Sequence, residues 1–145
     1  MKFDSSYLYC IYHNPEEYRR LIKRITKKVL LLKKTLKFHA IAFRGTSGAA
    51  MAYPISAATS IPLICVHKPV DKSHGGLVEG SSKIDVKKYI IIDDFIATGA
   101  TIRAIIKEID VRRGRYSVKC VGIILYGDDY NTFKKWQNIP ITKVK

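Results

Sequence analysis

The chain has 145 residues, of which 47% are hydrophobic, and this size and apolar content are those of one folded domain. The apolar content excludes a disordered chain, while only 9 glycines and 5 prolines exclude a collagen-like or low-complexity sequence. Lysine and arginine number 26 against 12 aspartates and glutamates, so the net charge is +14, which favours anionic partners without choosing among them.

Cysteine spacing and hydropathy suggest where the protein works. Cys10, Cys65 and Cys120 are odd in number and lack C-x-x-C spacing, so we expect reduced thiols rather than a disulfide or a zinc site. No apolar run approaches the roughly 20 residues of a transmembrane helix, and the first residues lack the apolar core of a secretory signal. We therefore expect a cytoplasmic protein with no membrane partner.

Residues 13–37 are predicted to form one long amphipathic helix. Asn14 can cap its start, Pro15 suits the first helical position, and Glu16 and Glu17 complement the positive end of the helix dipole. Apolar side chains recur at three- and four-residue steps along one face: Tyr18, Leu21, Ile22, Ile25, Val29, Leu32 and Leu36.

The opposite face of this predicted helix is basic. It carries nine basic residues: Arg19, Arg20, Lys23, Arg24, Lys27, Lys28, Lys33, Lys34 and Lys37. Together with the two glutamates they leave a net charge of +7, which is half the net charge of the chain. The simplest interpretation is a solvated helix face, and the alternative is a surface that binds anions.

Short apolar segments then alternate with helical ones. Strands are predicted at residues 38–43, 61–66, 89–92 and 118–126, and helices at 47–60, bent or interrupted near Pro54, and at 101–112, with Gly114 just past the end. Residues 67–83 are polar and are predicted to form a long loop or a flexible hairpin. The last 19 residues show no obvious regular element.

Strands that are apolar throughout and alternate with helices predict a parallel sheet covered on both faces. In such folds ligands bind in the crevice at the carboxyl ends of the strands. Arg44 follows the first strand, residues 67–83 follow the second, and Asp93 with Asp94 closes the third. We therefore expect a functional crevice at this edge of the sheet.

Residues 89–101 (YIIIDDFIATGAT) are the most informative stretch of the sequence. They combine a strand, two carboxylates, a loop of small residues and a helix N-terminus, where backbone N–H groups can cradle an anion. Thr98 and Thr101 can add hydroxyl donors, and Gly99 permits a close approach or a positive φ. Adjacent carboxylates suit sugar hydroxyls or a hydrated divalent cation, so the segment predicts a ligand with a phosphate beside a diol. Neither a Walker A loop nor a dinucleotide fingerprint is present.

This segment closely resembles the phosphoribosyl-pyrophosphate (PRPP) signature of type I phosphoribosyltransferases. Residues 43–48 occupy the place of the family's pyrophosphate loop, and the pair Arg44-Gly45 is similar to that loop in the adenine and xanthine enzymes. Residues 67–80 resemble the mobile flap of the orotate enzymes, in which Lys72 and His74 keep the K-x-H-G spacing.

The resemblance implies an α/β fold with a central parallel sheet flanked by helices, a type I phosphoribosyltransferase-like core with a reduced hood. The whole chain, residues 1–145, would be a single domain. Its parts would be an N-terminal segment (1–37) with the basic helix, a core (38–126) that includes a flap (67–83), and a C-terminal hood segment (127–145).

The implied activity is a Mg²⁺-dependent transfer that converts a nucleobase and PRPP to a nucleoside 5′-monophosphate and pyrophosphate, with purines slightly preferred over orotate. A homodimer is implied as well. The implied catalytic residues are Lys72, His74, Asp93 and Asp94, and the two aspartates would also hold the metal, directly or through water. The implied PRPP-binding residues are Arg44, Gly45, Lys68, Asp93, Asp94, Ala97, Thr98, Gly99, Ala100 and Thr101.

Two other functions fit the same residues. One is a PRPP-sensing regulator of the same fold that binds RNA or DNA, an interpretation that the basic helix supports. Nucleic acid is thus a candidate partner, though not the favoured one. The other is a non-catalytic assembly or a binder of a different phosphosugar. The lysine- and histidine-bearing flap favours the enzyme, because a sensor has less need to shield a reaction from water.

Overall fold

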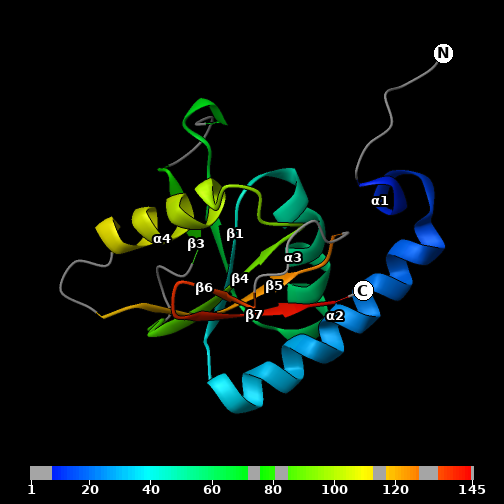
Figure 1. Cartoon of the computed structure of the whole chain (residues 1–145), viewed down its shortest axis with the longest axis horizontal. Coiled ribbons are helices and arrows are strands. Elements are labelled where there is room, and N and C mark those ends of the chain that lie inside the picture. The colour runs from blue at the N-terminus through cyan, green and yellow to red at the C-terminus, as the bar shows by residue number, and fades with distance from the viewer. Residues whose placement is uncertain (1–7, 72–75, 81–84, 113–116, 128–133, 145) are drawn as a thin grey trace.

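A seven-stranded sheet in the order β3-β2-β1-β4-β5-β7-β6 forms the centre of the protein (Figure 1). The structure is a computed structural model, and it describes residues 8–71, 76–80, 85–112, 117–127 and 134–144. The helices are α1 (Tyr9–His13), α2 (Pro15–Leu36), α3 (Gly45–Thr59) and α4 (Ala100–Arg112), with a short 3₁₀ helix, η1 (Pro69–Asp71). The strands are β1 (Ala40–Phe43), β2 (Leu63–Val66), β3 (Val78–Gly80), β4 (Lys88–Asp93), β5 (Lys119–Leu125), β6 (Lys135–Trp136) and β7 (Ile139–Lys143).

The five inner strands, β2, β1, β4, β5 and β7, run parallel to one another, whereas the edge strands β3 and β6 are antiparallel to their neighbours. Parallel strands end at the same edge of the sheet, so the residues that follow β1, β2 and β4 come together there. The predicted α/β architecture with a central, mostly parallel sheet is confirmed.

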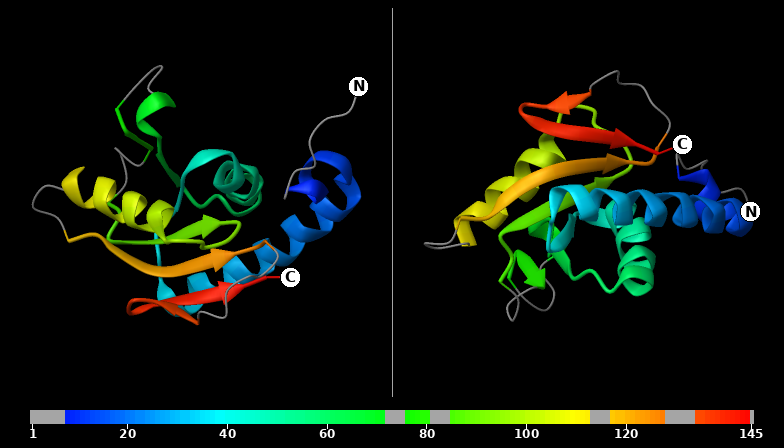
Figure 2. Two further views of the ribbon diagram at one scale, coloured as in Figure 1. Left: turned by 45° about the horizontal axis from the view of Figure 1, so that its top comes forward. Right: turned by 90° about the horizontal axis from the view of Figure 1, so that it is seen from below.

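Each face of the sheet has its own hydrophobic core, because successive strand residues point to opposite sides. On one face, Ile41 and Ile92 pack with residues of α2 and α3 such as Ile25. On the other face, Ile91 and its neighbours pack with the buried side of α4. The helices thus form layers on both sides of the sheet (Figure 2).

The start of α2 follows the sequence signals. The side chain of Asn14 accepts a hydrogen bond from the Glu17 backbone N–H at 3.1 Å, and Pro15 takes the first helical position. The helix ends at Leu36, and Lys37 follows in a left-handed conformation with φ of 51°. The predicted helix over residues 13–37 is therefore confirmed from Pro15 onward, while His13 belongs to the separate short helix α1.

Of the bend or interruption predicted near Pro54, the interruption is wrong, since α3 is continuous from Gly45 to Thr59. Proline lacks the N–H that would bond the carbonyl four residues earlier, here that of Ala50. The Tyr18 hydroxyl of α2 donates a hydrogen bond to this carbonyl instead. The neighbouring helix thus replaces the missing bond, and the helix passes through the proline.

The C-terminal segment differs from the prediction. Its last residues are not irregular, because β7 pairs in parallel with β5 and β6 forms a hairpin with β7. Ile139 and Ile141 pack on the α4 side of the sheet, with Pro140 between them, and this proline hides the strand pattern in the sequence.

In the polar segment after β2, strand β3 pairs antiparallel with β2, which makes this segment a hairpin rather than a plain loop.

Within the described ranges, no helix combines the length and the apolar character needed to cross a membrane. All three cysteines are free thiols, and each is partly buried. Gly114, predicted to follow α4, lies outside the described residues.

Candidate functional site

A cavity of about 570 Å³ opens at the carboxyl ends of β1, β2 and β4. Three segments line it: residues 44–47 after β1, residues 68–70 after β2, and residues 93–102 between β4 and the first turn of α4. The lining includes every described residue that the sequence assigned to PRPP: Arg44, Gly45, Lys68, Asp93, Asp94, Ala97, Thr98, Gly99, Ala100 and Thr101. Lys72 and His74, the other two predicted site residues, lie outside the described residues.

Strand β4 carries the two carboxylates to this edge. Its residues from Tyr89 to Ile92 are buried between the two cores, and Asp93 ends the strand opposite Leu125 of β5. Asp93 and Asp94 are themselves only 4% and 5% exposed. Two adjacent buried carboxylates are costly for a folded protein, so their presence at a cavity wall points to a ligand.

A hydrogen-bond network fixes the position of Asp93. Its Oδ1 accepts a hydrogen bond from the Ser47 hydroxyl and another from the Asp94 backbone N–H, both at 3.0 Å. Tyr126, just after β5, donates its hydroxyl proton to the Ser47 carbonyl oxygen at 2.5 Å. The first turn of α3 and the end of β5 thus hold the carboxylate in place.

Burial also changes the acidity of this group. Desolvation raises the pKa of Asp93 from 3.8 to about 7, and the neighbouring Asp94 adds to the shift. The pKa of Tyr126 is raised as well, first by burial and then by the charge of Asp94. Asp94 Oδ2 is buried, and it has no hydrogen-bond partner among the described residues. This oxygen is therefore available to a cation or a hydroxyl group in the cavity.

Cationic groups also line the cavity. Gly45 has a φ of +70°, and a Cβ placed on it would lie 3.6 Å from Cε of Lys68 and 3.8 Å from its Nζ. The Lys68 ammonium thus lies over the loop that follows β1. Arg44 has a buried Nε with no hydrogen-bond partner in the described part of the chain. An unpartnered buried donor beside a lysine suits an anionic ligand.

The loop between β4 and α4 leads into the helix N-terminus. Thr98 Oγ1 accepts a hydrogen bond from the Ala100 N–H at 3.3 Å, and the Gly99 carbonyl accepts the first helical bond, from Arg103, at 2.9 Å. Gly99 has a φ of +76°, which a residue with a side chain rarely adopts. The loop thus presents backbone N–H groups at the positive end of α4, as an anion site requires.

Trp136 of β6 packs against this loop, a contact that the sequence did not reveal. A Cβ on Gly99 would lie only 1.9 Å from Cη2 of the indole, so the ring packs directly against the glycine. The Arg103 guanidinium lies 5.5 Å from the centre of the same ring. Trp136 is the only tryptophan, but its place in the unassigned C-terminal segment gave no link to the loop. Ser47 and Tyr126 were likewise missed, because only the fold brings them to Asp93.

Comparison with known proteins shows the family of this chain. The sequence profile of the PRTase-CE family matches residues 5–144, nearly the whole chain. The chain belongs to the PRTase-CE family. This agrees with the resemblance to type I phosphoribosyltransferases, which is thereby confirmed.

Solved structures with the same fold include a UMP synthase and two phosphoribosyltransferases. Leishmania donovani UMP synthase shares 23% identity over 93% of this PRTase-CE chain and 28% of its own, with a TM-score of 0.61. Francisella tularensis orotate phosphoribosyltransferase shares 17% over 86% of this chain and 63% of its own, with a TM-score of 0.63. Trypanosoma brucei adenine phosphoribosyltransferase, solved with AMP, pyrophosphate and ribose-5-phosphate, shares 19% over 92% and 66%, with a TM-score of 0.66.

These identities establish the fold alone. The PRTase-CE chain covers between 28% and 66% of the length of these three neighbours. No curated protein matches the sequence.

Proposed function

We propose that this PRTase-CE protein is a Mg²⁺-dependent phosphoribosyltransferase, which transfers the 5-phosphoribosyl group of PRPP to a nitrogen of a nucleobase. The observation that carries the proposal is the meeting, in one cavity, of a buried carboxylate pair, a helix N-terminus with a small-residue loop, and two cationic side chains. PRPP needs each of these groups, since it has a 5′-phosphate, a ribose diol and a pyrophosphate.

The loop from Ala97 to Thr101 is proposed to bind the 5′-phosphate. Its backbone N–H groups and the α4 dipole favour a dianion, and the loop lacks a side-chain carboxylate that would repel one. Trp136 would keep the loop in its shape by packing against Gly99. Arg44, Gly45 and Lys68, which line the same cavity, would bind the pyrophosphate.

The ribose hydroxyls are assigned to Asp93 and Asp94. Asp93 is fixed by Ser47, whereas Asp94 has a buried oxygen without a partner among the described residues, so a sugar hydroxyl or a cation would satisfy it. Ligand binding that favours the ionised pair would also release a proton from Asp93, whose pKa of about 7 reflects burial in the free protein.

The donor set fits Mg²⁺. No cluster of three or more His, Cys, Asp or Glu side chains occurs among the described residues, so within this part of the chain the carboxylate pair would provide the protein ligands. Mg²⁺ binds in this manner, through one or two carboxylates with waters and substrate oxygens completing the shell. When bound, it would neutralise charge that develops on the pyrophosphate.

In the proposed reaction, the bond between ribose C1 and the pyrophosphate oxygen breaks, and its electron pair leaves with pyrophosphate. A nitrogen of the base forms the new bond to C1, and its N–H proton passes to the leaving pyrophosphate. The protein's residues contribute by orientation and by charge: Asp93 and Asp94 hold the ribose as positive charge develops on it, and Arg44 and Lys68 stabilise the leaving group. Lys72 and His74 are proposed to join Lys68 on the pyrophosphate, with closure of residues 67–83 excluding water.

For the acceptor we propose a planar nucleobase, with purines preferred over orotate. Phe95 and Val70 line the cavity with apolar side chains that are 37% and 88% exposed. Exposed apolar groups beside a polar pocket offer a surface against which a flat base can stack. The preference for purines rests on the Arg44-Gly45 pair and on the loop over residues 97–101, because both segments resemble those of the purine enzymes of the family.

A turnover assay tests this function directly. The protein is incubated with PRPP, Mg²⁺ and one of adenine, hypoxanthine, guanine or orotate, and pyrophosphate release is measured. We expect release that depends on the added base and is fastest with a purine. If PRPP binds but no base produces release, the site is a PRPP sensor rather than an enzyme. If PRPP does not bind at all, the assignment of the cavity is wrong.

A further inference from the structure

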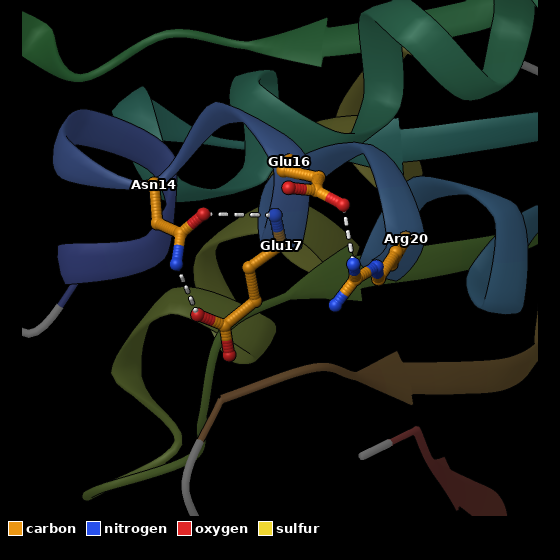
Figure 3. A network of polar contacts seen from close by, with 4 residues as sticks. All are labelled: Asn14, Glu16, Glu17 and Arg20. Carbon is orange, nitrogen blue, oxygen red and sulfur yellow. Dashed lines mark hydrogen bonds and ion pairs between the residues drawn. The ribbon is translucent and has the colours of Figure 1, made fainter.

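The exposed face of α2 has a distribution of charge that the phosphoribosyl site does not explain. The acidic side chains of this helix lie in its first turn, and both are engaged there (Figure 3). Glu16 pairs with Arg20, and Glu17 accepts a hydrogen bond from the Asn14 side-chain amide at 3.2 Å. No aspartate or glutamate follows Glu17 in the helix, so the rest of α2 has no acidic group of its own.

Most of the remaining cations of α2 have no partner in the described part of the chain. The residues of this set are exposed, and none makes a hydrogen bond or ion pair with any residue that the structure describes: Arg19, Lys23, Arg24, Lys27, Lys28 and Lys34. Lys33 differs, since its ammonium reaches the Phe38 carbonyl oxygen at 3.4 Å and lies over the Phe38 ring. Six like charges on one helix repel each other, so a polyanion would stabilise them.

The orientation of α2 is fixed by its opposite side. Leu21, Ile25 and Val29 are buried in the core shared with α3 and the sheet. Because this apolar face is used inside the protein, the helix cannot insert it into a lipid bilayer, as membrane-binding amphipathic helices do. The exposed leucines, Leu30 and Leu31, are too few to replace it. The surface therefore favours nucleic acid over a membrane.

The arrangement suits a duplex rather than a single strand. Lys23, Lys27 and Lys34 lie on one outward row, because steps of four and seven residues return to the same side of a helix. The 22 residues of α2 span about 33 Å, a length over which a duplex presents one phosphate charge about every 1.7 Å of its axis. The row has no aromatic side chain, whereas single-strand binding relies on bases stacked on such rings.

We propose that the exposed face of α2 binds the phosphate backbone of a nucleic-acid duplex. Its contacts are lysine and arginine charges on phosphates, which position a protein without reading bases, so the binding is independent of sequence. No residue of α2 lines the cavity at the strand ends. The surface thus lies apart from the PRPP site and would attach the protein to nucleic acid while that site stays open.

The test measures binding of the full chain to a labelled duplex of about 20 base pairs, twice the length that α2 can cover. Affinity is measured between about 50 and 200 mM salt. Each phosphate contact contributes about −0.9 to the slope of log K against log salt, so changing Lys23, Lys27 and Lys34 to Gln should make the slope less steep by about 2.7. A matched control changes Lys107, Lys119 and Lys135 to Gln, which removes the same charge from exposed positions outside α2.

We expect the α2 variant to lose most of its duplex affinity and the control variant to keep it. A third variant, Glu16→Gln, releases Arg20 from its ion pair and should steepen the slope by up to about 0.9. Equal losses in the two lysine variants would overturn the proposal, since binding would then follow net charge alone. Absence of binding to the duplex, or binding only to vesicles of phosphatidylserine and phosphatidylcholine, would overturn it as well.

Discussion

The crevice at the strand ends and the exposed face of α2 hold charge in opposite ways. In the crevice, Asp93 and Asp94 are 4% and 5% exposed, and Asp93 is held by hydrogen bonds from Ser47 and from the Asp94 backbone. On α2, six cations are exposed and have no partner among the described residues, whereas Arg20 pairs with Glu16 and Lys33 reaches the Phe38 carbonyl oxygen. Burying a charge costs desolvation free energy, and a charge held in one position can select a ligand by its geometry. An exposed charge on a flexible side chain costs little free energy and attracts any polyanion.

This contrast predicts that PRPP binding in the crevice and duplex binding on α2 can be abolished independently by mutation. The largest effect is expected for the double variant Asp93→Asn, Asp94→Asn, which removes both charges from the crevice. PRPP affinity in the presence of Mg²⁺ should fall at least about 100-fold, equivalent to about 2.7 kcal/mol. Duplex binding should stay as in the wild type, because α2 is untouched. An unfolded variant would be recognised by circular dichroism, and the single Asp94→Asn variant would then test the same charge.

The second prediction concerns the phosphate loop. Gly99→Ala places a Cβ 1.9 Å from the Trp136 ring at a backbone φ of +76°. The left-handed conformation alone costs roughly 1–3 kcal/mol for a residue with a side chain, and the clash forces the loop or the indole to move. We expect a lower melting temperature together with PRPP affinity reduced by more than about tenfold, or about 1.4 kcal/mol. Gly76→Ala serves as a control for the melting temperature alone, since a Cβ there would meet only the Val78 carbonyl oxygen among the described residues, at 4.0 Å.

A smaller effect is expected for Trp136, which we propose to be a positioning residue. Trp136→Leu removes the ring behind Gly99, and PRPP affinity should fall by about tenfold or less, since the loop keeps its own sequence. Trp136→Phe retains a ring and should bind PRPP more tightly than the leucine variant does. Calorimetry and melting curves separate the two possible roles. A lower melting temperature with unchanged PRPP affinity in both variants would reduce Trp136 to a packing residue.

The smallest effect is a pH dependence of stability. The folded protein keeps a proton on Asp93 up to a pKa of about 7, whereas the unfolded chain loses it near 3.8. The folded state thus binds more protons between these values, so the contribution of Asp93 is greatest below about pH 4 and is lost as the pH rises through about 7. The melting temperature of the wild type should fall relative to that of Asp93→Asn, by a few degrees, as the pH rises from 5 to 8. A constant difference between the two proteins across this range would show that Asp93 is ionised throughout.

The sequence predicted the crevice better than its surroundings. Residues 89–101 could be recognised from sequence because a strand, two carboxylates, a loop and a helix start follow one another without a gap. Each of these features depends on neighbouring residues, so sequence patterns were enough to predict it. The start of α2 was predicted for the same reason, since Asn14 and Pro15 act on the next few residues. The general rule that parallel strands end at one edge placed Arg44 and residues 67–83 at the crevice, whereas the assignment of Lys68 to PRPP came from the family resemblance.

What the sequence did not reveal depends on contacts between distant segments. Tyr18 completes α3 at Ala50 across 32 residues, and Tyr126 supports Ser47 across 79. Trp136 reaches Gly99 only because β7 joins the sheet beside β5, a strand pairing that Pro140 and the short length of β6 conceal. Burial and hydrogen bonding of this kind follow from the assembled fold and have no local signature.

A calorimetric titration of PRPP with Mg²⁺ into the wild-type protein tests the central claim, that the carboxylate pair and the phosphate loop form one PRPP site. The same titration is repeated with the Asp93→Asn, Asp94→Asn variant and with the variant in which Lys23, Lys27 and Lys34 are changed to Gln. We predict saturable binding to the wild type and to the α2 variant, and at least about 100-fold weaker binding to the carboxylate variant when it is folded. Equal binding to all three proteins, or no binding to the wild type at millimolar PRPP, would contradict the account.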